Sequence, residues 1–143
     1  MAKLGKARVP TESERKRLFA VTRADAHGVR NCAMLAVSYF TGMRAKEIAS
    51  LRIGHVRDEN GKLREECRLS CSMTKGGIPR VAYLTHLTLR QALKDYLDER
   101  SARDVLVGDD SILFKSQYGG GFSANSLQQL LRRLHDRAGI VGG

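Results

Sequence analysis

Tryptophan is absent from this chain of 143 residues, and cysteine occurs only three times, at Cys32, Cys67 and Cys71. An odd number of cysteines without a C-x-x-C pair argues against a disulfide framework and against a zinc site. Cys67 and Cys71 lie four residues apart in a strand-like stretch, which would place both on one face. We therefore expect both to be buried as small apolar side chains.

Long apolar runs are missing as well. No stretch approaches the roughly 18 apolar residues that a membrane-spanning helix requires, and the N-terminus does not read as a signal peptide. A basic amphipathic helix with bulky aromatic residues, which is typical of membrane surfaces, is not seen either. The sequence therefore predicts a cytoplasmic protein without a membrane partner.

Acidic residues are too few to balance the basic ones. The chain has 25 Lys and Arg against 15 Asp and Glu, a net charge of +10. This surplus favours a polyanionic partner, most simply nucleic acid, although a merely basic surface is the alternative. Hydrophobic residues make up 42% of the chain, which is ordinary for a globular protein, and the length is sufficient for one domain with a core.

Helical patterns dominate the first part of the chain. Residues 1–10 are basic and aperiodic, and we interpret them as a flexible basic arm. Thr11 and Glu14 have the spacing of a capping box, which predicts a helix to about Arg23. Apolar residues at helical spacing over 29–40 predict a second, buried helix that ends at a Thr-Gly pair.

The middle of the chain changes its period. A short helix is expected over 45–51, followed by a turn at 58–61. Alternation of apolar and polar residues over 67–73 predicts a half-buried strand. The glycine pair 76–77 predicts a tight hairpin, and 80–84 is then the return strand.

Two further helices are expected in the last part of the chain. The first begins with a capping pair at Thr88 and Gln91, and the second with a pair at Ser126 and Gln129. Gly139 should end the second helix. The expected fold class is α+β: a mostly α-helical domain with one small antiparallel sheet of about three strands.

The stretch FTGMRAKEIASL, residues 40–51, raises the main functional question. A helix, a turn and a second helix resemble the start of a helix-turn-helix, which would indicate a transcription factor. A recognition helix would have to follow, but the chain continues into a turn and a strand. This alternative is therefore the weaker one.

Arg44 follows the glycine turn directly and opens the short helix. A guanidinium held there can bind two phosphate oxygens at once and stabilise charge that develops during phosphoryl transfer. Glu47 lies three residues further on the same helix face and could orient Arg44. Lys75, beside Gly76 and Gly77, could donate a proton to a leaving oxygen. The alternatives are a surface Arg-Glu pair and a solvated turn lysine.

These residues carry a family resemblance. The stretches TGMRAKEIASL (41–51) and TKGGIPRV (74–81) resemble the catalytic domain of tyrosine recombinases, the phage-integrase family, and 113–140 is similar to a later segment of it. The match in kind and order runs from about Thr11 to Gly139. It implies that 11–143 are the N-terminal and central part of the catalytic domain, without the family's N-terminal core-binding domain.

The resemblance implies site-specific DNA recombination or integration through a 3′-phosphotyrosyl intermediate, without a metal or other cofactor. Arg44 would clamp the scissile phosphate, Glu47 would support it, and Lys75 would be the general acid for the leaving 5′ oxygen. The partner would be double-stranded DNA, with self-association into a recombinase tetramer in the full protein. Such enzymes are bacterial or phage-encoded and act at the nucleoid. Candidate DNA contacts are Lys46, Arg52, Arg80, Lys115, Arg132 and Arg133.

The family pattern also requires a His-x-x-Arg motif, a further His or Trp, and the nucleophilic tyrosine after the last helix. The printed sequence reaches Gly143 before any of these, so we expect an incomplete catalytic domain that cannot cleave DNA alone. The one His-x-x-Arg match, His27 to Arg30, precedes Arg44, and we interpret it as coincidental.

No tyrosine of the chain fits the nucleophile. Tyr83 and Tyr96 are expected in the core, Tyr39 lies inside a helix, and Tyr118 lies in a glycine-rich loop without an activating base. Two further interpretations therefore stay open. The chain could be a non-catalytic DNA-binding remnant or regulator, or a protein-interaction module on the same fold.

Overall fold

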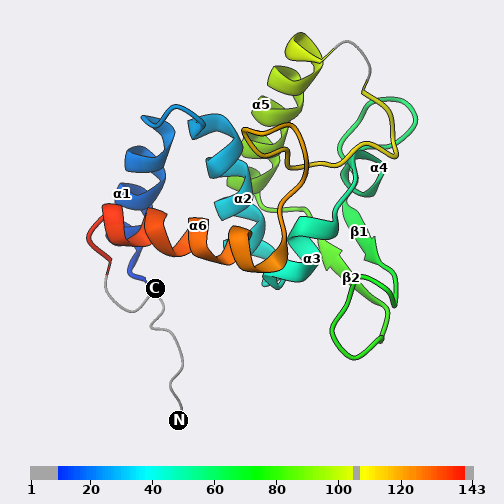
Figure 1. Ribbon diagram of the computed structural model, residues 1–143, viewed down its shortest axis with the longest axis horizontal. Coiled ribbons are helices and arrows are strands. Elements are labelled where there is room, and N and C mark those ends of the chain that lie inside the picture. The colour runs from blue at the N-terminus through cyan, green and yellow to red at the C-terminus, as the bar shows by residue number, and fades with distance from the viewer. Residues whose placement is uncertain (1–9, 105–106, 141–143) are drawn as a thin grey trace.

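The computed structural model describes residues 10–104 and 107–140, so the basic arm expected at 1–10 lies almost entirely outside the described residues. The described residues form six helices and two strands (Figure 1). In chain order these are α1 Glu12–Arg23, α2 Gly28–Thr41, α3 Ala45–Ser50, α4 Ile53–Val56, β1 Glu66–Leu69, β2 Arg80–Tyr83, α5 Leu87–Arg103 and α6 Ala124–Arg137. The mostly helical α+β class is confirmed.

The first two helices follow the sequence patterns closely. Thr11 Oγ1 accepts a hydrogen bond from Glu14 N at 3.2 Å, and Glu14 Oε1 accepts one from Thr11 N at 2.9 Å, so the capping box is confirmed. α2 ends where Gly42 adopts a left-handed conformation, with φ of 71°. A residue without Cβ adopts that conformation at little cost.

Helix α2 is the centre of the core, packing against α1 and α5 (Figure 1). The larger hydrophobic cluster joins α2 to the short helices, the sheet and α5. A smaller cluster lies where α1, α2 and α6 meet; its buried members are Leu18, Leu35, Leu134, Ala138 and Ile140. Burial of a large apolar side chain stabilises a fold by about 1.5–3 kcal/mol, so both clusters hold the helices in place.

The sheet is smaller than expected. β1 and β2 pair antiparallel, with Cys67 opposite Ala82, and these two strands form the whole sheet within the described residues. Arg57 and Leu63 form only an isolated bridge around the turn at 58–61, so the expectation of about three strands is wrong by one.

The strand expected over 67–73 ends at Leu69, and the chain then turns. Met73 N donates to Ser70 O at 3.0 Å within this turn. The turn breaks the alternation of faces, so Cys71 is exposed while Met73 is buried. The expected burial is confirmed for Cys67 and wrong for Cys71.

Two tyrosines expected in the core differ in burial. Tyr96 is 2% exposed, and its hydroxyl accepts a hydrogen bond from Lys115 N at 3.1 Å. Tyr83 is 60% exposed, because on β2 Ala82 takes the inward position while Val81 and Tyr83 point outward. The expectation of a core position is therefore wrong for Tyr83.

Two expected caps are displaced along the chain. At α5 the capping residue is His86, whose Nδ1 accepts from Thr88 N at 3.1 Å. At α6 it is Ser123, whose Oγ accepts from Ser126 N at 3.0 Å. Thr88 and Ser126 therefore lie inside the first turns. Gly139, with φ of 76°, follows the end of α6 as expected. Within the described residues, every helix is too short or too polar to cross a membrane.

Candidate functional site

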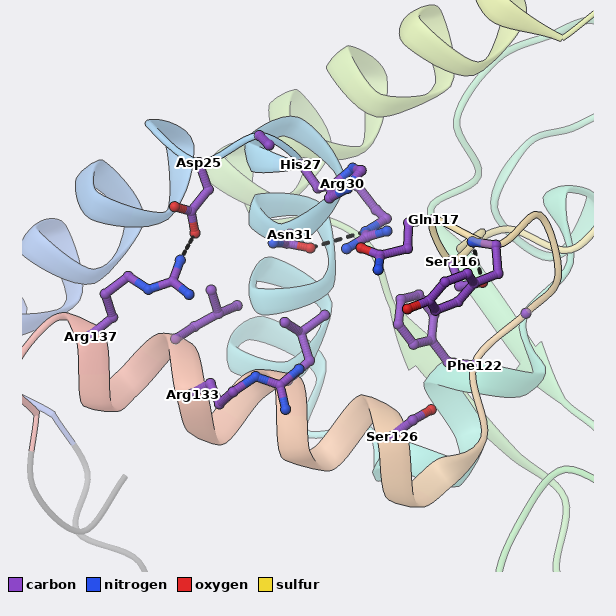
Figure 2. A pocket seen from close by; sticks show the side chains of 15 residues that line it. Asp25, His27, Arg30, Asn31, Ser116, Gln117, Phe122, Ser126, Arg133 and Arg137 are labelled. Carbon is purple, nitrogen blue, oxygen red and sulfur yellow. Dashed lines mark hydrogen bonds and ion pairs between the residues drawn. The ribbon is translucent and has the colours of Figure 1, made fainter.

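A pocket of about 580 Å³ lies between the N-terminal end of α2, α6 and the glycine-rich loop (Figure 2). His27 and Arg30 line it. Arg30 is 8% exposed and donates to Asn31 Oδ1 at 3.0 Å and to the Lys115 carbonyl at 3.1 Å, while its guanidinium lies over the Phe122 ring. Arg30 therefore joins α2 to the segment after α5.

Arg30 itself is remote from Arg44. Arg30 lies in the first turn of α2 and Arg44 follows its last, and a helix of 14 residues spans about 20 Å. Arg133 of α6 also lines this pocket, so the structure groups this candidate DNA contact with Arg30 (Figure 2).

The turn before Arg44 is fixed by its own side chains. Thr41 Oγ1 donates to the Val37 carbonyl at 2.5 Å and accepts from Met43 N at 3.1 Å. Met43 is 4% exposed and belongs to the larger core cluster. Arg44 itself is the extended N-cap residue of α3, and its side chain reaches solvent. The backbone at Arg44 is therefore held on both sides while the side chain is free to bind.

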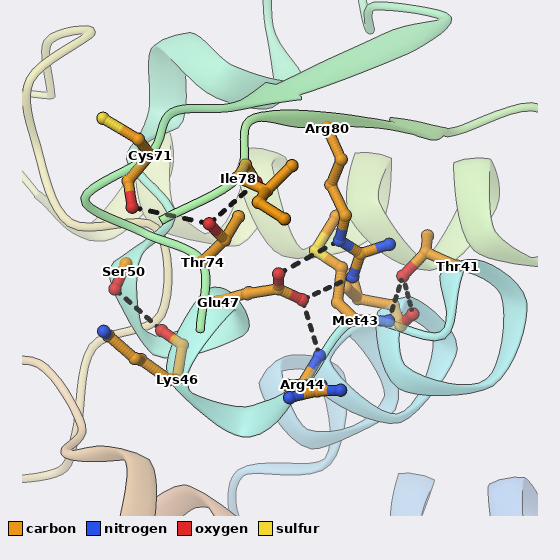
Figure 3. A network of polar contacts seen from close by, with 11 residues as sticks. Thr41, Met43, Arg44, Lys46, Glu47, Ser50, Cys71, Thr74, Ile78 and Arg80 are labelled. Carbon is orange, nitrogen blue, oxygen red and sulfur yellow. Dashed lines mark hydrogen bonds and ion pairs between the residues drawn. The ribbon is translucent and has the colours of Figure 1, made fainter. Parts of the chain in front are cut away.

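Glu47 supports Arg44 through the backbone. Glu47 is 2% exposed, and its Oε1 accepts a hydrogen bond from Arg44 N at 2.9 Å (Figure 3). Arg80 of β2 donates to both oxygens of the same carboxylate, from Nη2 to Oε1 at 2.5 Å and from Nε to Oε2 at 3.1 Å. The Arg44 guanidinium has no ion-pair partner among the residues that the structure describes.

These contacts keep Glu47 ionised. The hydrogen bonds from Arg80, more than any other contact, lower the pKa of the Glu47 carboxyl group, and the bond from the Arg44 amide lowers it further. Burial acts in the opposite direction and is outweighed. The same pair raises the pKa of Arg80. At neutral pH the site therefore contains a buried carboxylate, ion-paired with a partly exposed Arg80, beside an unpaired arginine.

Lys75 lies in the loop that connects β1 and β2. The loop extends away from the helical body (Figure 1), and Lys75 is exposed in it. Gly76 and Gly77 have the positive φ that a tight hairpin needs, 85° and 72°. The expectation of a tight hairpin is nevertheless wrong, because β1 ends at Leu69 and β2 begins only at Arg80. Thr74 is 5% exposed and donates from Oγ1 to the Ile78 carbonyl at 2.8 Å. This hydrogen bond holds the two sides of the loop together. The sequence does not single out Thr74 for this role, because a threonine beside a glycine turn carries no distinctive pattern.

The other candidate DNA contacts are dispersed over the surface. Lys46 is exposed on α3, two residues from Arg44. Arg52 and Lys115 line a separate depression of about 580 Å³. Arg52 Nη1 donates to the Asp110 carbonyl at 2.7 Å, and Lys115 Nζ lies 3.6 Å from Asp104 Oδ1. Arg132 is exposed on α6.

The tyrosines and histidines offer no second catalytic constellation in the described part of the chain. Tyr118 is 88% exposed in the glycine-rich loop. The Tyr39 hydroxyl lies 3.3 Å from His135 Nε2, and these two rings stack between α2 and α6. The described residues also contain no group of three or more His, Cys, Asp or Glu able to hold a metal ion.

Known proteins with similar sequences are recombinases. The model of the phage integrase family matches residues 8–142. The tyrosine recombinase XerD of Oceanobacillus iheyensis is 29% identical over 134 residues, which cover 92% of this chain and 42% of that protein. XerC of Lactobacillus delbrueckii subsp. bulgaricus is 28% identical over 120 residues, covering 80% of this chain and 37% of that protein. The chain thus spans less than half the length of these relatives.

Solved structures agree with this relationship. The crystal structure of XerA recombinase superposes with a TM-score of 0.71 at 26% identity and covers 95% of this chain and 45% of that one. A lambda integrase dimer bound to a core site has a TM-score of 0.63 at 15% identity, covers 98% of this chain and 45% of that one, and supports the fold alone. From the family match over nearly its whole length, the chain belongs to the phage integrase family of tyrosine recombinases.

Proposed function

We propose that these residues are part of the catalytic domain of a site-specific DNA recombinase and supply two groups that act on the scissile phosphate. One observation carries the proposal. The buried Glu47 carboxylate is occupied by the Arg44 amide and by Arg80, which leaves the Arg44 guanidinium exposed on a rigid turn without an ion pair among the described residues. An arginine presented in this way is suited to a phosphate.

The chemistry follows from the family. A tyrosine hydroxyl attacks the phosphorus, a 3′-phosphotyrosyl bond forms, and the bond to the 5′ oxygen breaks. Arg44 stabilises the charge on the non-bridging oxygens, and Lys75 gives a proton to the leaving 5′ oxygen. The bond energy is conserved for religation, so no nucleotide cofactor is required, and Arg44 and Lys75 supply the charge stabilisation and the proton without a metal. The attacking tyrosine is none of those described above.

We further propose that the partner is duplex DNA and that the protein self-associates on it, working at the nucleoid of a bacterial cell or on phage DNA. The solved relatives include a lambda integrase tetramer bound to a Holliday junction. Backbone contacts would come from Lys46, Arg52, Lys115, Arg132 and Arg133, of which Lys46 lies nearest to Arg44 along the chain.

The first test is the salt dependence of duplex binding by the chain and by Arg44→Gln. Each neutralised phosphate contributes about 0.9 to the slope of log affinity against log salt. We expect Arg44→Gln to weaken binding about tenfold or more and to reduce the slope by about 1. Lys16→Gln, which removes the same charge from an exposed position on α1, should leave both nearly unchanged. Absence of salt-dependent binding by the unaltered chain would favour a protein-interaction module.

A second test separates the enzyme from a DNA-binding regulator. The 143 residues alone should form no covalent adduct with duplex DNA, because they contain no tyrosine that fits the nucleophile. The product of the full natural gene should form one, detectable as a protein–DNA band that survives denaturation. A full product that binds DNA but never forms the adduct would support the regulator.

A further inference from the structure

We propose that Arg80 is a positioning residue that neutralises Glu47, and that it does not contact DNA. This inference rests on the proposed function and refines the site described above. Arg80 keeps the carboxylate in place so that Glu47 holds the Arg44 backbone without capturing the Arg44 guanidinium. It also ties the strand that follows Lys75 to the helix that follows Arg44.

The geometry of the pair supports this role. Two N–H groups of Arg80 reach both oxygens of Glu47, a bidentate arrangement that fixes orientation as well as charge. The Glu47 side chain is 3% exposed, so its carboxylate is buried. The side chain of Arg80, the first residue of β2, is 40% exposed and approaches Glu47 from the surface. With one N–H of Nε and one of Nη2 directed to Glu47, Arg80 has fewer free donors to offer a phosphate than Arg44.

The buried charge of Glu47 requires a cation. A buried carboxylate without a cation is strongly unfavourable, so it must be protonated, move to solvent or find another cation. Without Arg80, Glu47 would keep one neutral partner, the Arg44 amide. Besides Arg80, the cation that acts on Glu47 is the guanidinium of that same Arg44, three residues earlier on the same face. Capturing it would withdraw Arg44 from the phosphate and place a negative charge beside the DNA.

The ion pair also links the two segments of the site. Glu47 lies three residues after Arg44, and Arg80 lies five residues after Lys75. Between Lys75 and Arg80, the hydrogen bond from Thr74 to the Ile78 carbonyl limits the freedom of the loop. Figure 3 shows Glu47 bridging from α3 to Arg80 on the strand. The relative position of Arg44 and Lys75 therefore depends on this contact.

A double-mutant cycle in duplex binding tests the role, using Arg80→Gln, Glu47→Gln and the double variant. We expect Arg80→Gln to weaken binding about tenfold. The double variant should recover most of this loss, because the amide oxygen introduced by Glu47→Gln still accepts from the Arg44 N–H but carries no charge. The control is Arg68→Gln, which removes an exposed arginine from the neighbouring strand and should change binding little.

A direct phosphate contact predicts a different result. Arg80→Gln and the double variant would then lose affinity equally, and the salt slope would fall by about 1 in both. Equal losses would overturn the proposal. A role in stability alone is separated by urea unfolding of each variant, because Glu47→Gln relieves the unpaired buried charge in either case. We expect the binding loss of Arg80→Gln to persist where this variant is fully folded; a loss that follows the unfolded fraction would overturn the proposal.

Hydrogen exchange at the Arg44 amide supplies a readout that does not depend on DNA. Exchange should be faster in Arg80→Gln than in the unaltered protein and slow again in the double variant. Unchanged exchange in Arg80→Gln would overturn the proposal, even if no variant binds duplex and the proposed function fails. Should Arg80→Gln not fold, Arg80→Lys retains the charge without the bidentate contact and should show intermediate exchange; unaltered exchange there would count against the proposal.

Discussion

At the scale of single residues, the three thiols have different surroundings. Cys32 and Cys67 are buried, at 3% and 0% exposure, whereas Cys71 is exposed in the turn after β1. Burial raises the pKa of Cys67 to about 11 and also raises that of Cys32. Since the thiolate is the reactive form, the two buried thiols are protected both by access and by protonation.

We therefore expect one thiol per folded chain to react rapidly with a water-soluble disulfide reagent at about pH 8, and three after unfolding. Cys71→Ser should abolish the rapid reaction, while Cys32→Ser should leave it unchanged. The measurement is the stoichiometry of the fast phase. Two fast thiols in the folded protein would show that the surroundings of Cys32 or of Cys67 open readily.

The site itself shows what sequence spacing can predict. Arg44 and Glu47 are recognisable because they share a short helix, and the turn before them has its own signal in Thr41 and Gly42. The partner of Glu47 is not recognisable in the same way, because Arg80 comes from a strand 33 positions away. Spacing within a helix predicted a contact between side chains, but a bidentate partner from the sheet satisfies the carboxylate better.

At the scale of elements, the bend between α2 and α3 depends on Gly42. Its φ of 71° is unfavourable for residues with a Cβ, and a Cβ placed there would meet no other atom within 4 Å. We expect Gly42→Ala to lower the free energy of unfolding by about 1 kcal/mol through backbone strain alone. Urea unfolding of the variant measures this cost.

The matched control is Gly120→Ala. Gly120 also has open space around its Cβ position but lacks the positive φ of Gly42. Its replacement should change the free energy of unfolding little. A destabilisation of the same size at Gly120 would show that the positive φ of Gly42 is not its cause, since the lower conformational freedom of the unfolded chain acts in the opposite direction.

Some boundaries of the helices and strands could be predicted from sequence patterns, and others could not. The extents of α1 and α2 follow from one capping box and one apolar stripe, and the structure agrees. The caps of α5 and α6 were displaced because His86 and Ser123 also carry suitable acceptors, and local spacing does not rank neighbouring candidates. The first strand was predicted too long, because the turn that breaks it has no glycine or proline.

At the scale of the whole molecule, stability should fall in acid. Hydrogen bonds from Arg80 lower the pKa of Glu47, and hydrogen bonds from Arg100 lower that of Asp104. A carboxyl group whose pKa is lower in the folded state binds fewer protons there than in the unfolded state. Its contribution is therefore complete above the ordinary carboxyl pKa of about 4 and is lost as the pH falls toward the lowered value.

The measurement is the free energy of unfolding in urea between about pH 7 and about pH 3. We expect little change from Glu47 and Asp104 above about pH 5 and a decline below about pH 4. Glu47→Gln should show a shallower decline, because it no longer takes up a proton on unfolding. A profile of the same slope in this variant would contradict the role of the Glu47–Arg80 pair.

The smaller hydrophobic cluster has a consequence for biosynthesis. It brings Leu18 of α1 against Leu134 of α6, and Arg17 Nε donates to the Ala138 carbonyl, 121 positions later in the chain. At about 5–20 residues per second, a ribosome needs roughly 6–24 s to travel from one side of this contact to the other. For that time α1 has no partner on its α6 side. Among the described helices α1 is made first, but it is among the last of them to complete its packing.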